Sequence, residues 1–180
     1  MKLDKEYEAE LKLGFISSTG DIEGEIRRGG EVGDLNRAEV EKVAKGFIGK
    51  IWQKVPVYSA VKINGRRAYD LARKGIELER KPRKVEVKKL REIKILRNEK
   101  IKISFFVEVS SGTYIRSLVR DIGEKLGVFA TMTRLVRTKI DQFVIEDAVT
   151  IDELEQKFLK FDKNEEKNLE KLEKLENLGY

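Results

Sequence analysis

The chain has 180 residues, with 38 Lys and Arg, 32 Asp and Glu, no histidine and no cysteine. The missing histidine excludes Ser-His and Cys-His nucleophile systems and imidazole metal ligands, and the missing cysteine excludes disulfides, zinc–thiolate sites and thiol nucleophiles. Any chemistry therefore depends on carboxylates, amines, guanidinium groups, hydroxyls, tyrosine and the backbone. No apolar run approaches the roughly 18 residues of a membrane span, and we expect a cytoplasmic protein.

Strand, loop and helix are predicted in turn over the first fifty residues. The alternation of apolar and polar residues over Tyr7–Leu13 predicts a half-buried strand. Residues 14–24 are rich in Gly, Ser and Thr and are predicted to form a loop. Asn36 and Glu39 then make a capping-box pattern ahead of a short amphipathic helix that ends near Gly49.

The middle of the chain is predicted to be irregular and then to form a hairpin. Residues 54–83 are irregular and basic, with a short helix around 68–74. Residues 84–96 and 101–109 carry apolar side chains in the pattern of strands, and the polar residues 97–99 between them favour an antiparallel hairpin.

The last third of the chain is predicted to be mainly helical. Apolar side chains recur at helical spacing over 114–126, and Gly127 follows as a C-terminal stop. Short strands are predicted over 132–136 and 143–145. From Thr150 onward the chain becomes acidic and helical, opening with another capping-box pattern.

Strands mixed with segregated helices define an α+β fold with a mainly antiparallel sheet and flanking helices. We assign residues 1–150 to one domain, with 54–83 as an insertion within it, and residues 151–180 to a charged helical tail.

The basic side chains concentrate in the part of the chain that holds this insertion. Residues 50–102 contain 18 basic and 6 acidic side chains, a local charge of +12, whereas both ends of the chain are acidic. A surface of this kind suits a polyanion, because each Lys or Arg placed on a phosphate releases a counterion. The charge alone leaves open a merely solvated basic face.

Four stretches occur in an order and spacing that carry further information. They are KEYEAELKLGFISSTGDIEG from Lys5, QKVPVYSAVKINGRRAYDLARKG from Gln53, SSGTYIRSLVRDIGEKLG from Ser110 and ATMTRLVRT from Ala130. Together they resemble the TruB-type bacterial tRNA pseudouridine synthases over about residues 5–145. The resemblance implies a pseudouridine-synthase-like catalytic domain.

The resemblance also implies roles for four side chains. Tyr7 would lie against a flipped-out uracil, Tyr114 and Leu135 would line the uridine pocket, and Arg116 would hold the catalytic aspartate in its ionised form. The residues themselves leave alternatives open. Tyr7 is also suited to be an ordinary core aromatic, and a guanidinium among apolar helix residues also suits a structural ion pair with a local acid.

Residues 54–83 correspond to the RNA-gripping insertion of this family, and their composition supports that role independently, since basic and aromatic residues interleave. The basic residues expected to contact RNA are Lys62, Arg66, Arg67, Arg73, Lys74, Arg80, Lys81 and Arg83.

One element of the family pattern is absent. In the family the catalytic aspartate lies in a G-x-x-D-P segment upstream of the K-x-Y motif, and here that motif begins at residue 5. We therefore expect an incomplete catalytic domain, with the aspartate lost by truncation or by a misassigned start, or carried on a separate chain. Asp21, Asp70 and Asp121 are alternative nucleophiles by residue type only.

The resemblance implies conversion of a T-arm uridine of tRNA to pseudouridine, without cofactor or metal. The aspartate attacks the nucleotide, the glycosidic C–N bond breaks, the uracil turns over, and C5 is joined to the ribose. We expect this chain alone to bind tRNA without isomerising it. The alternative is a non-catalytic RNA-binding or RNA-chaperone protein on the same fold. A segment encoding G-x-x-D-P just upstream of Met1 would favour the enzyme over the alternative.

Overall fold

A central strand, β1 (Lys5–Leu13), organises the fold, because β8 (Ile101–Val109) pairs with it on one side and β9 (Ala130–Ile140) on the other. The computed structural model describes residues 3–56, 58–59, 81–97 and 101–160, together with the backbone of 62–63 and 66–67. The chain divides into two units, Met1–Val144 and Ile145–Tyr180.

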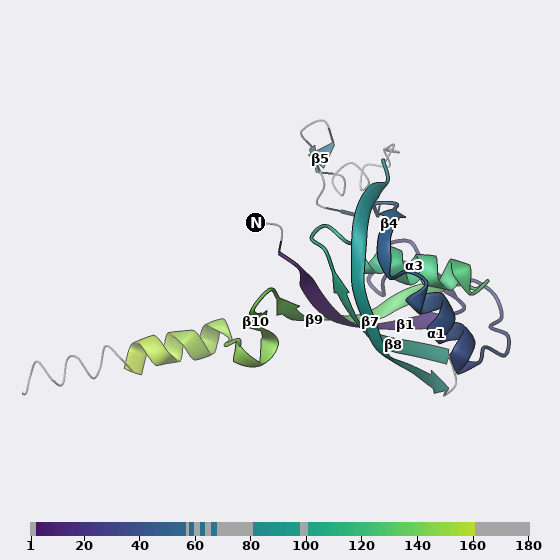
Figure 1. Cartoon of the computed structure of the whole chain (residues 1–180). Helices are drawn as coiled ribbons and strands as arrows, with labels where there is room; N and C mark the ends of the chain where they lie inside the picture. Colours follow the sequence, from purple (N-terminus) through teal and green to yellow (C-terminus); the bar gives the residue numbers. More distant parts are fainter. Residues whose placement is uncertain are drawn as a thin grey trace, which may run out of the picture. The chain divides into compact units, whose positions relative to one another are not determined.

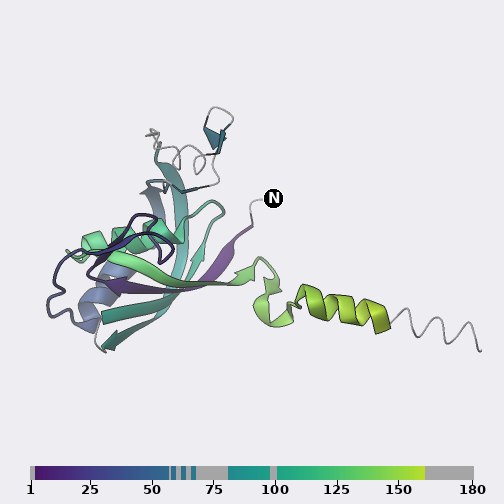
Figure 2. The same ribbon diagram turned by 180° about the vertical axis from the view of Figure 1, so that it is seen from behind.

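Six strands form one antiparallel sheet in the first unit (Figure 1). Beyond β8 lie β7 (Arg83–Arg97) and the edge strand β4 (Gly49–Gln53), and beyond β9 lies β10 (Phe143–Val144). Figure 2 shows β9 running beside β1, although the two strands come from distant parts of the sequence. The predicted α+β fold with a mainly antiparallel sheet is confirmed.

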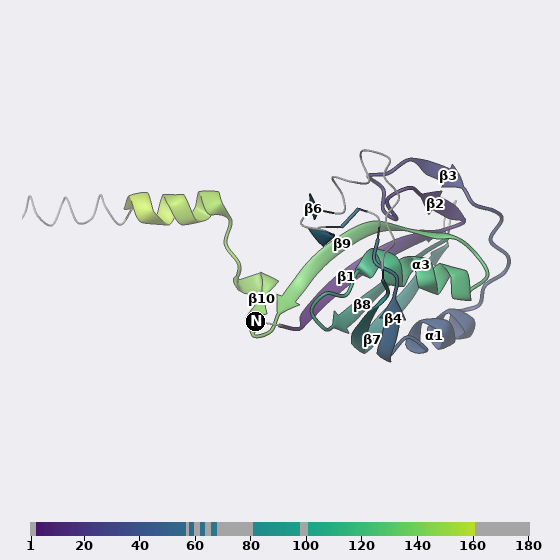
Figure 3. The same cartoon turned by 90° about the horizontal axis from the view of Figure 1, so that it is seen from above.

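Two helices, α1 (Arg37–Lys45) and α3 (Ile115–Lys125), pack with one face of the sheet into a single hydrophobic core (Figure 3). Side chains on that face of the strands are almost fully buried, and so is the apolar side of α3. The largest of them are Leu11, Leu13, Ile103, Phe105, Leu118 and Ile122. Burial of each such side chain contributes about 1.5–3 kcal/mol to folding.

The helices predicted after Asn36 and over 114–126 are confirmed, with shorter bounds. The Asn36 side chain accepts a hydrogen bond from the Glu39 backbone N–H at 2.8 Å, as the capping pattern predicted. α1 ends at its C-cap Gly46 rather than near Gly49, which instead opens β4 with a φ of 112°. Gly127 follows α3 with a φ of 73°, a backbone conformation that glycine adopts without strain.

The hairpin of β7 and β8 is confirmed, and β7 departs from simple alternation. Its buried residues Val85, Val87, Leu90 and Ile93 are separated first by two and then by three positions. Two β-bulges add the extra residues, and Glu92 in the second adopts a φ of 54°. Each bulge turns the next apolar side chain back to the core face.

The opposite face of the sheet carries matched charges. Glutamates at alternate positions of β1 accept hydrogen bonds from basic side chains on its neighbours. The pairs are Glu6 with Arg91 at 3.0 Å, Glu8 with Arg134 at 2.7 Å and Glu10 with Lys102 at 2.9 Å. β9 extends to Ile140, beyond the predicted 132–136, and in this extension the Thr138 hydroxyl donates to the Glu6 carboxylate at 3.0 Å, a contact that an apolar pattern does not reveal.

Three short segments were not predicted correctly. β2 (Phe15–Ser17) lies where the sequence predicted a loop over 14–24, and it pairs with β3 (Ile26–Arg28), a segment for which no element was predicted. β4 was missed altogether. Runs of three to five residues carry too little periodicity to distinguish a strand from a loop, and pairing decides them. The helix predicted around 68–74 lies outside the described residues.

The second unit begins with a short 3-10 helix, Ile145–Asp147, and residues 151–160 are helical. The predicted capping box at the start of helix 151–160 is confirmed. The Glu153 backbone N–H donates to the Thr150 hydroxyl at 3.2 Å, and the Glu153 carboxylate accepts from the Thr150 N–H at 2.7 Å. In the part of the chain that the structure describes, no helix is both long and apolar enough to cross a membrane.

The charged face generates a prediction on pH. A hydrogen bond from Lys102, helped by one from Thr133, holds the pKa of the Glu10 carboxyl below its ordinary value, against the opposing effect of burial. Because the folded-state pKa is lowered, the ionised Glu10 carboxylate stabilises the folded protein at pH values above its unfolded pKa. This stabilisation is lost as the pH falls through the folded pKa. We expect Glu10→Gln to lower the free energy of unfolding by about 0.5–1 kcal/mol near pH 7, and by less in acid.

Urea unfolding near pH 7 and near pH 3 measures this difference. Glu23→Gln is the control, because Glu23 is exposed and forms no ion pair with the described residues. A loss on Glu10→Gln that stays the same at both pH values would contradict the assignment.

Candidate active site and RNA interface

Arg116, in the first turn of α3, joins three parts of the chain through its guanidinium. Its Nη1 donates to Oδ2 of Asp21 at 2.9 Å and to the Thr19 carbonyl at 3.3 Å, and its Nη2 donates to the Tyr58 carbonyl at 2.8 Å. The Arg116 side chain is 24% exposed and that of Asp21 is 16% exposed. This pair is therefore largely removed from water, and it is worth more than a surface pair.

Asp21 is held by its own loop as well as by Arg116. Its carboxylate also accepts hydrogen bonds from the Thr19 hydroxyl and from the Glu23 backbone N–H. The loop is docked on β9, where Asp21 forms a parallel bridge with Met132. Of the two partners that the sequence left open for Arg116, the described residues contain the local acid.

Tyr7 and Leu135 lie on the same face of the sheet. Leu135 on β9 is opposite Ala9, and Arg137 is opposite Tyr7. Directly opposite residues point to the same side of a sheet, so these side chains lie on the core face, to which the buried Ala9 belongs. Tyr7 packs partly against the core, with the Arg137 guanidinium 5.6 Å from the centre of its ring, whereas Leu135 is 40% exposed. Leu135 is thus accessible on the core face of the sheet.

Tyr114 is fixed through its backbone. The Gln53 side chain, which is 1% exposed, donates from Nε2 to the Tyr114 carbonyl at 3.0 Å and accepts from the Tyr114 N–H at 2.8 Å. The hydroxyl of Ser117 donates to the Lys54 carbonyl at 2.9 Å. Together with the contact of Arg116 to Tyr58, these bonds join the segment that leads into the basic insertion to the start of α3.

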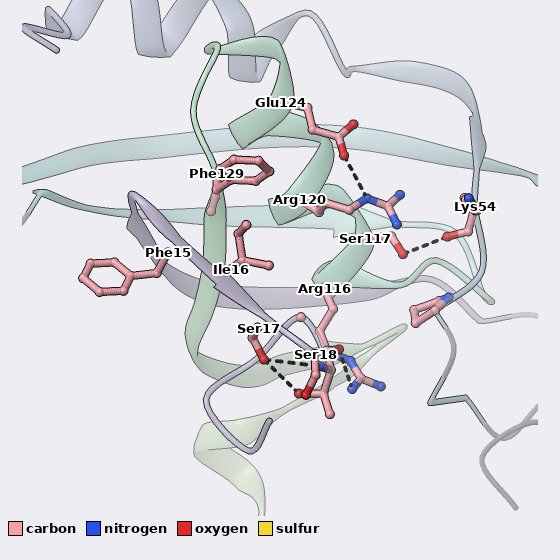
Figure 4. Close-up of a pocket in the computed structure, with 14 residues that line it drawn as sticks. Phe15, Ile16, Ser17, Ser18, Lys54, Arg116, Ser117, Arg120, Glu124 and Phe129 are labelled. Carbon is pink, nitrogen blue, oxygen red and sulfur yellow. Dashed lines mark hydrogen bonds and ion pairs between the residues drawn. The ribbon is translucent and has the colours of Figure 1, made fainter. Parts of the chain in front are cut away.

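A cavity of about 280 Å³ opens beside Arg116. Figure 4 shows its mixed lining, with Ile16 and Phe129 on one side and Lys54 and Arg120 on the other. Its volume lies near the lower end of the roughly 300–1,000 Å³ of small-ligand pockets. The predicted uridine-pocket residues Tyr7, Tyr114 and Leu135 do not line this cavity. Arg116 is the predicted site residue that does.

The alternative nucleophiles have different surroundings. Asp21 is occupied by Arg116, as described above. Asp121 accepts hydrogen bonds from Arg120, and burial raises the pKa of its carboxyl against the lowering effect of that bond. Asp70 lies outside the described residues. The described residues contain no group of three acidic side chains that could hold a metal ion.

The structure describes only part of the predicted RNA-binding set. Lys62 lies in β5 (Lys62–Ile63), and Arg66 and Arg67 form β6, its antiparallel partner. Lys81 and Arg83 are exposed where the chain returns into β7. The remaining residues, Arg73, Lys74 and Arg80, lie outside the described residues.

Three contributors to the site were not predicted from the sequence. Gln53 and Arg137 stand inside the recognised stretches without an expected role, and Asp21 was considered only as a nucleophile. A buried glutamine can be suspected where a polar residue ends an apolar strand, but its partner sits 61 residues away along the chain. No local pattern identifies such a partner.

Comparison with known proteins identifies relatives over most of the chain. Residues 1–115 match the TruB family pseudouridylate synthase N-terminal domain, and residues 116–175 match the tRNA pseudouridylate synthase B C-terminal domain. Proteins named tRNA pseudouridine synthase B are similar in sequence. That of Clostridium perfringens (strain SM101 / Type A) is 43% identical over 89% of this chain, and that of Nitrosococcus oceani is 41% identical over 86%.

Solved structures share the fold. A crystal structure of a Cbf5–Nop10–Gar1 complex aligns over 83% of this chain and 34% of that chain, with a TM-score of 0.55 and 31% identity. An H/ACA RNP bound to a substrate RNA containing 2'-deoxyuridine aligns over 89% and 36%, with a TM-score of 0.56 and 26% identity. Fold and sequence therefore define a pseudouridylate synthase domain.

Within that class, the chain belongs to the TruB family. It spans about half the length of the curated relatives it matches, 54% of the Clostridium perfringens protein and 49% of the Nitrosococcus oceani protein.

The Gln53 contacts predict a loss of stability in a Gln53→Leu variant. The Tyr114 carbonyl keeps a second bond from the Leu118 N–H, but the Tyr114 N–H would be left without a partner. We expect the free energy of unfolding to fall by about 1–3 kcal/mol, measured by urea denaturation. Gln142→Leu is the control, because Gln142 is exposed in a turn. Equal effects of the two substitutions would refute this role for Gln53.

The Arg116–Asp21 pair predicts a coupling energy. In a double-mutant cycle of Arg116→Met and Asp21→Asn, we expect an interaction of about 1–3 kcal/mol in the free energy of unfolding, since the pair is mostly buried and hydrogen-bonded. The pair of Arg27 and Glu25 provides the comparison, because both side chains are more than two-thirds exposed. A coupling for Arg116 and Asp21 no larger than that of the exposed pair would count against the assignment.

Proposed function

We propose that this chain forms the uridine-binding and RNA-gripping part of a tRNA pseudouridine synthase that acts on a T-arm uridine. The observation that carries the proposal is the position of Arg116. It stands at the start of α3, bonded to Asp21 on one side and to the base of the basic insertion at Tyr58 on the other. A residue so placed serves a reaction centre and an RNA-binding segment at once. We infer that the protein works in the cytoplasm, on tRNA.

The face that carries Tyr7 and Leu135 suits an extruded base. Tyr7 offers a ring that Arg137 contacts, and base–aromatic stacking contributes about 1–3 kcal/mol per base toward the cost of unpairing. Leu135, partly exposed, would exclude water from the base, and Tyr114 would close the pocket from the start of α3.

We infer that the nucleophile is an aspartate supplied in the family's G-x-x-D-P context, which this sequence does not contain. The two prolines of the chain, Pro56 and Pro82, follow valine and lysine, so the sequence contains no Asp-Pro pair. Arg116 offers a planar fork of five N–H donors, and the contacts to described residues use only Nη1 and Nη2. We infer that Arg116 bridges Asp21 and an incoming aspartate, and keeps that aspartate ionised and oriented.

In this proposal the reaction is an isomerisation that uses no cofactor and no metal. The aspartate attacks the nucleotide, the bond between ribose C1′ and uracil N1 breaks, and a bond between C1′ and C5 replaces it. C5 loses its hydrogen and N1 gains a proton, so the composition is unchanged. A label on C5 is therefore released to water in each turnover.

The basic insertion supplies the grip on tRNA. Local charge supports this, since residues 50–102 carry +12. Binding of phosphates by these side chains would make the affinity fall with salt, because counterions are released. The insertion and the reaction centre are joined through Gln53, Lys54 and Tyr58, as described above.

Tritium release from 5-tritiated uridine in tRNA tests the proposal. We expect the 180-residue chain to bind tRNA in a salt-dependent way and to release no tritium. A chimera that adds a G-x-x-D-P segment of the family upstream of residue 5 is expected to release tritium. Arg116→Lys is expected to lower its kcat roughly 100-fold, because lysine lacks the planar fork that holds carboxylates in a fixed orientation.

Arg27→Lys in the same chimera is the control, since Arg27 is exposed and pairs only with Glu25 among the described residues. A chain that binds tRNA but gives an inactive, well-folded chimera would favour the second candidate, a non-catalytic RNA-binding protein. The absence of an Asp-Pro pair is the observation in its favour. Tritium release by the 180 residues alone would overturn the need for an external aspartate.

A further inference from the structure

Trp52 is an exposed aromatic side chain at the open edge of the sheet. It lies on β4, which pairs only with β7 in the described sheet, and it is 70% exposed. Register places it opposite Lys84 and next to the pair of Gln53 and Arg83. The chain enters the basic insertion directly after β4 and returns from it into β7, so Trp52 stands at the base of that insertion.

The cations around Trp52 differ from four cations on the charged face of the sheet. On the charged face, Lys88, Lys89, Arg91 and Lys102 each form an ion pair with an acid. Around Trp52, the exposed side chains of Lys54, Lys81, Arg83 and Lys84 form no ion pair with any described residue. Within the described part of the chain, no acid neutralises these charges.

Acidic side chains near Trp52 are already compensated or lie to one side. Trp52 and Lys54 line a hollow with Asp121 and Glu124 of α3, and both of these acids pair with Arg120. Glu86 lies opposite Lys50, two pairs away from Trp52 and Lys84 along the strands. The immediate surroundings of the indole ring are therefore positive.

We propose that Trp52 stacks on an unpaired nucleobase of the bound tRNA while Lys54 and Lys84 contact the adjacent phosphates. An exposed aromatic surrounded by free cations matches the chemistry of single-stranded RNA, which presents a flat base and a phosphate at each step. This contact lies outside the predicted uridine pocket and adds to the grip of the insertion. It rests on the proposed binding of tRNA.

The sequence supplies its own probe, because Trp52 is the only tryptophan in the chain. Titration of the whole chain with tRNA, with selective excitation of tryptophan, is expected to quench the emission of Trp52 by stacking. A free tryptophan analogue in the same titration corrects for absorption by the RNA. The wild-type measurement needs no variant and does not depend on how any variant folds.

Affinity measurements complete the test. We expect Trp52→Ala to weaken tRNA binding about tenfold and Trp52→Phe to restore most of the affinity, since a phenyl ring also stacks. Lys54→Gln and Lys84→Gln are each expected to lower the slope of log K against log salt by about one. Phe143→Ala is the matched control, because Phe143 is 65% exposed on β10, at the other edge of the same sheet, and should leave the affinity unchanged.

The outcomes separate this inference from the proposed function. Wild-type binding of tRNA with unchanged emission, or with full affinity in Trp52→Ala, overturns the stacking contact and leaves the proposed function standing. A blue shift of the emission with protein concentration in the absence of RNA, together with dimer formation, assigns the edge to a second copy of the chain and overturns it too. A wild-type chain that does not bind tRNA overturns both.

Discussion

The hydrogen bonds of Arg116 are the contacts on which the rest of the site depends. One guanidinium satisfies a carboxylate and two backbone carbonyls from separate parts of the chain, at Asp21, Thr19 and Tyr58. Partly buried carbonyls in irregular segments need donors, and only an arginine offers several in a rigid plane. The loop after β2, the start of α3 and the entry to the insertion therefore take up their positions together.

Gln53 likewise satisfies backbone groups at the start of α3 through its side chain. Its side-chain amide pairs with the backbone N–H and the backbone carbonyl of Tyr114, much as a neighbouring strand would. Because Gln53 is the last residue of β4, these hydrogen bonds fix the start of α3 to the sheet. In the proposed function, a reaction centre at this junction would gain rigidity from the sheet and contact with RNA from the insertion.

Basic side chains of the sheet differ in whether they form an ion pair with an acidic side chain. Across the outer face of the sheet, glutamates of β1 neutralise basic side chains of β7, β8 and β9, and this charge serves folding. At the junction of β4 and β7, Lys54, Arg83 and Lys84 have no acidic partner among the described residues. A count of lysines and arginines therefore does not show which of these side chains are already paired with acids of the sheet.

The sequence by itself determined the fold class, the helices with their caps, the long strands and the family, because these depend on local periodicity, on capping residues such as Asn36 and Thr150, and on motifs read along the chain. It also placed Tyr7, Tyr114, Arg116 and Leu135 as candidates. The tertiary structure alone decided that Asp21 is the described partner of Arg116, that Gln53 holds Tyr114, and that the bulges of β7 keep its apolar residues in phase. Those features join residues that are up to 95 positions apart, and contacts at such separations leave no periodic signal in the chain.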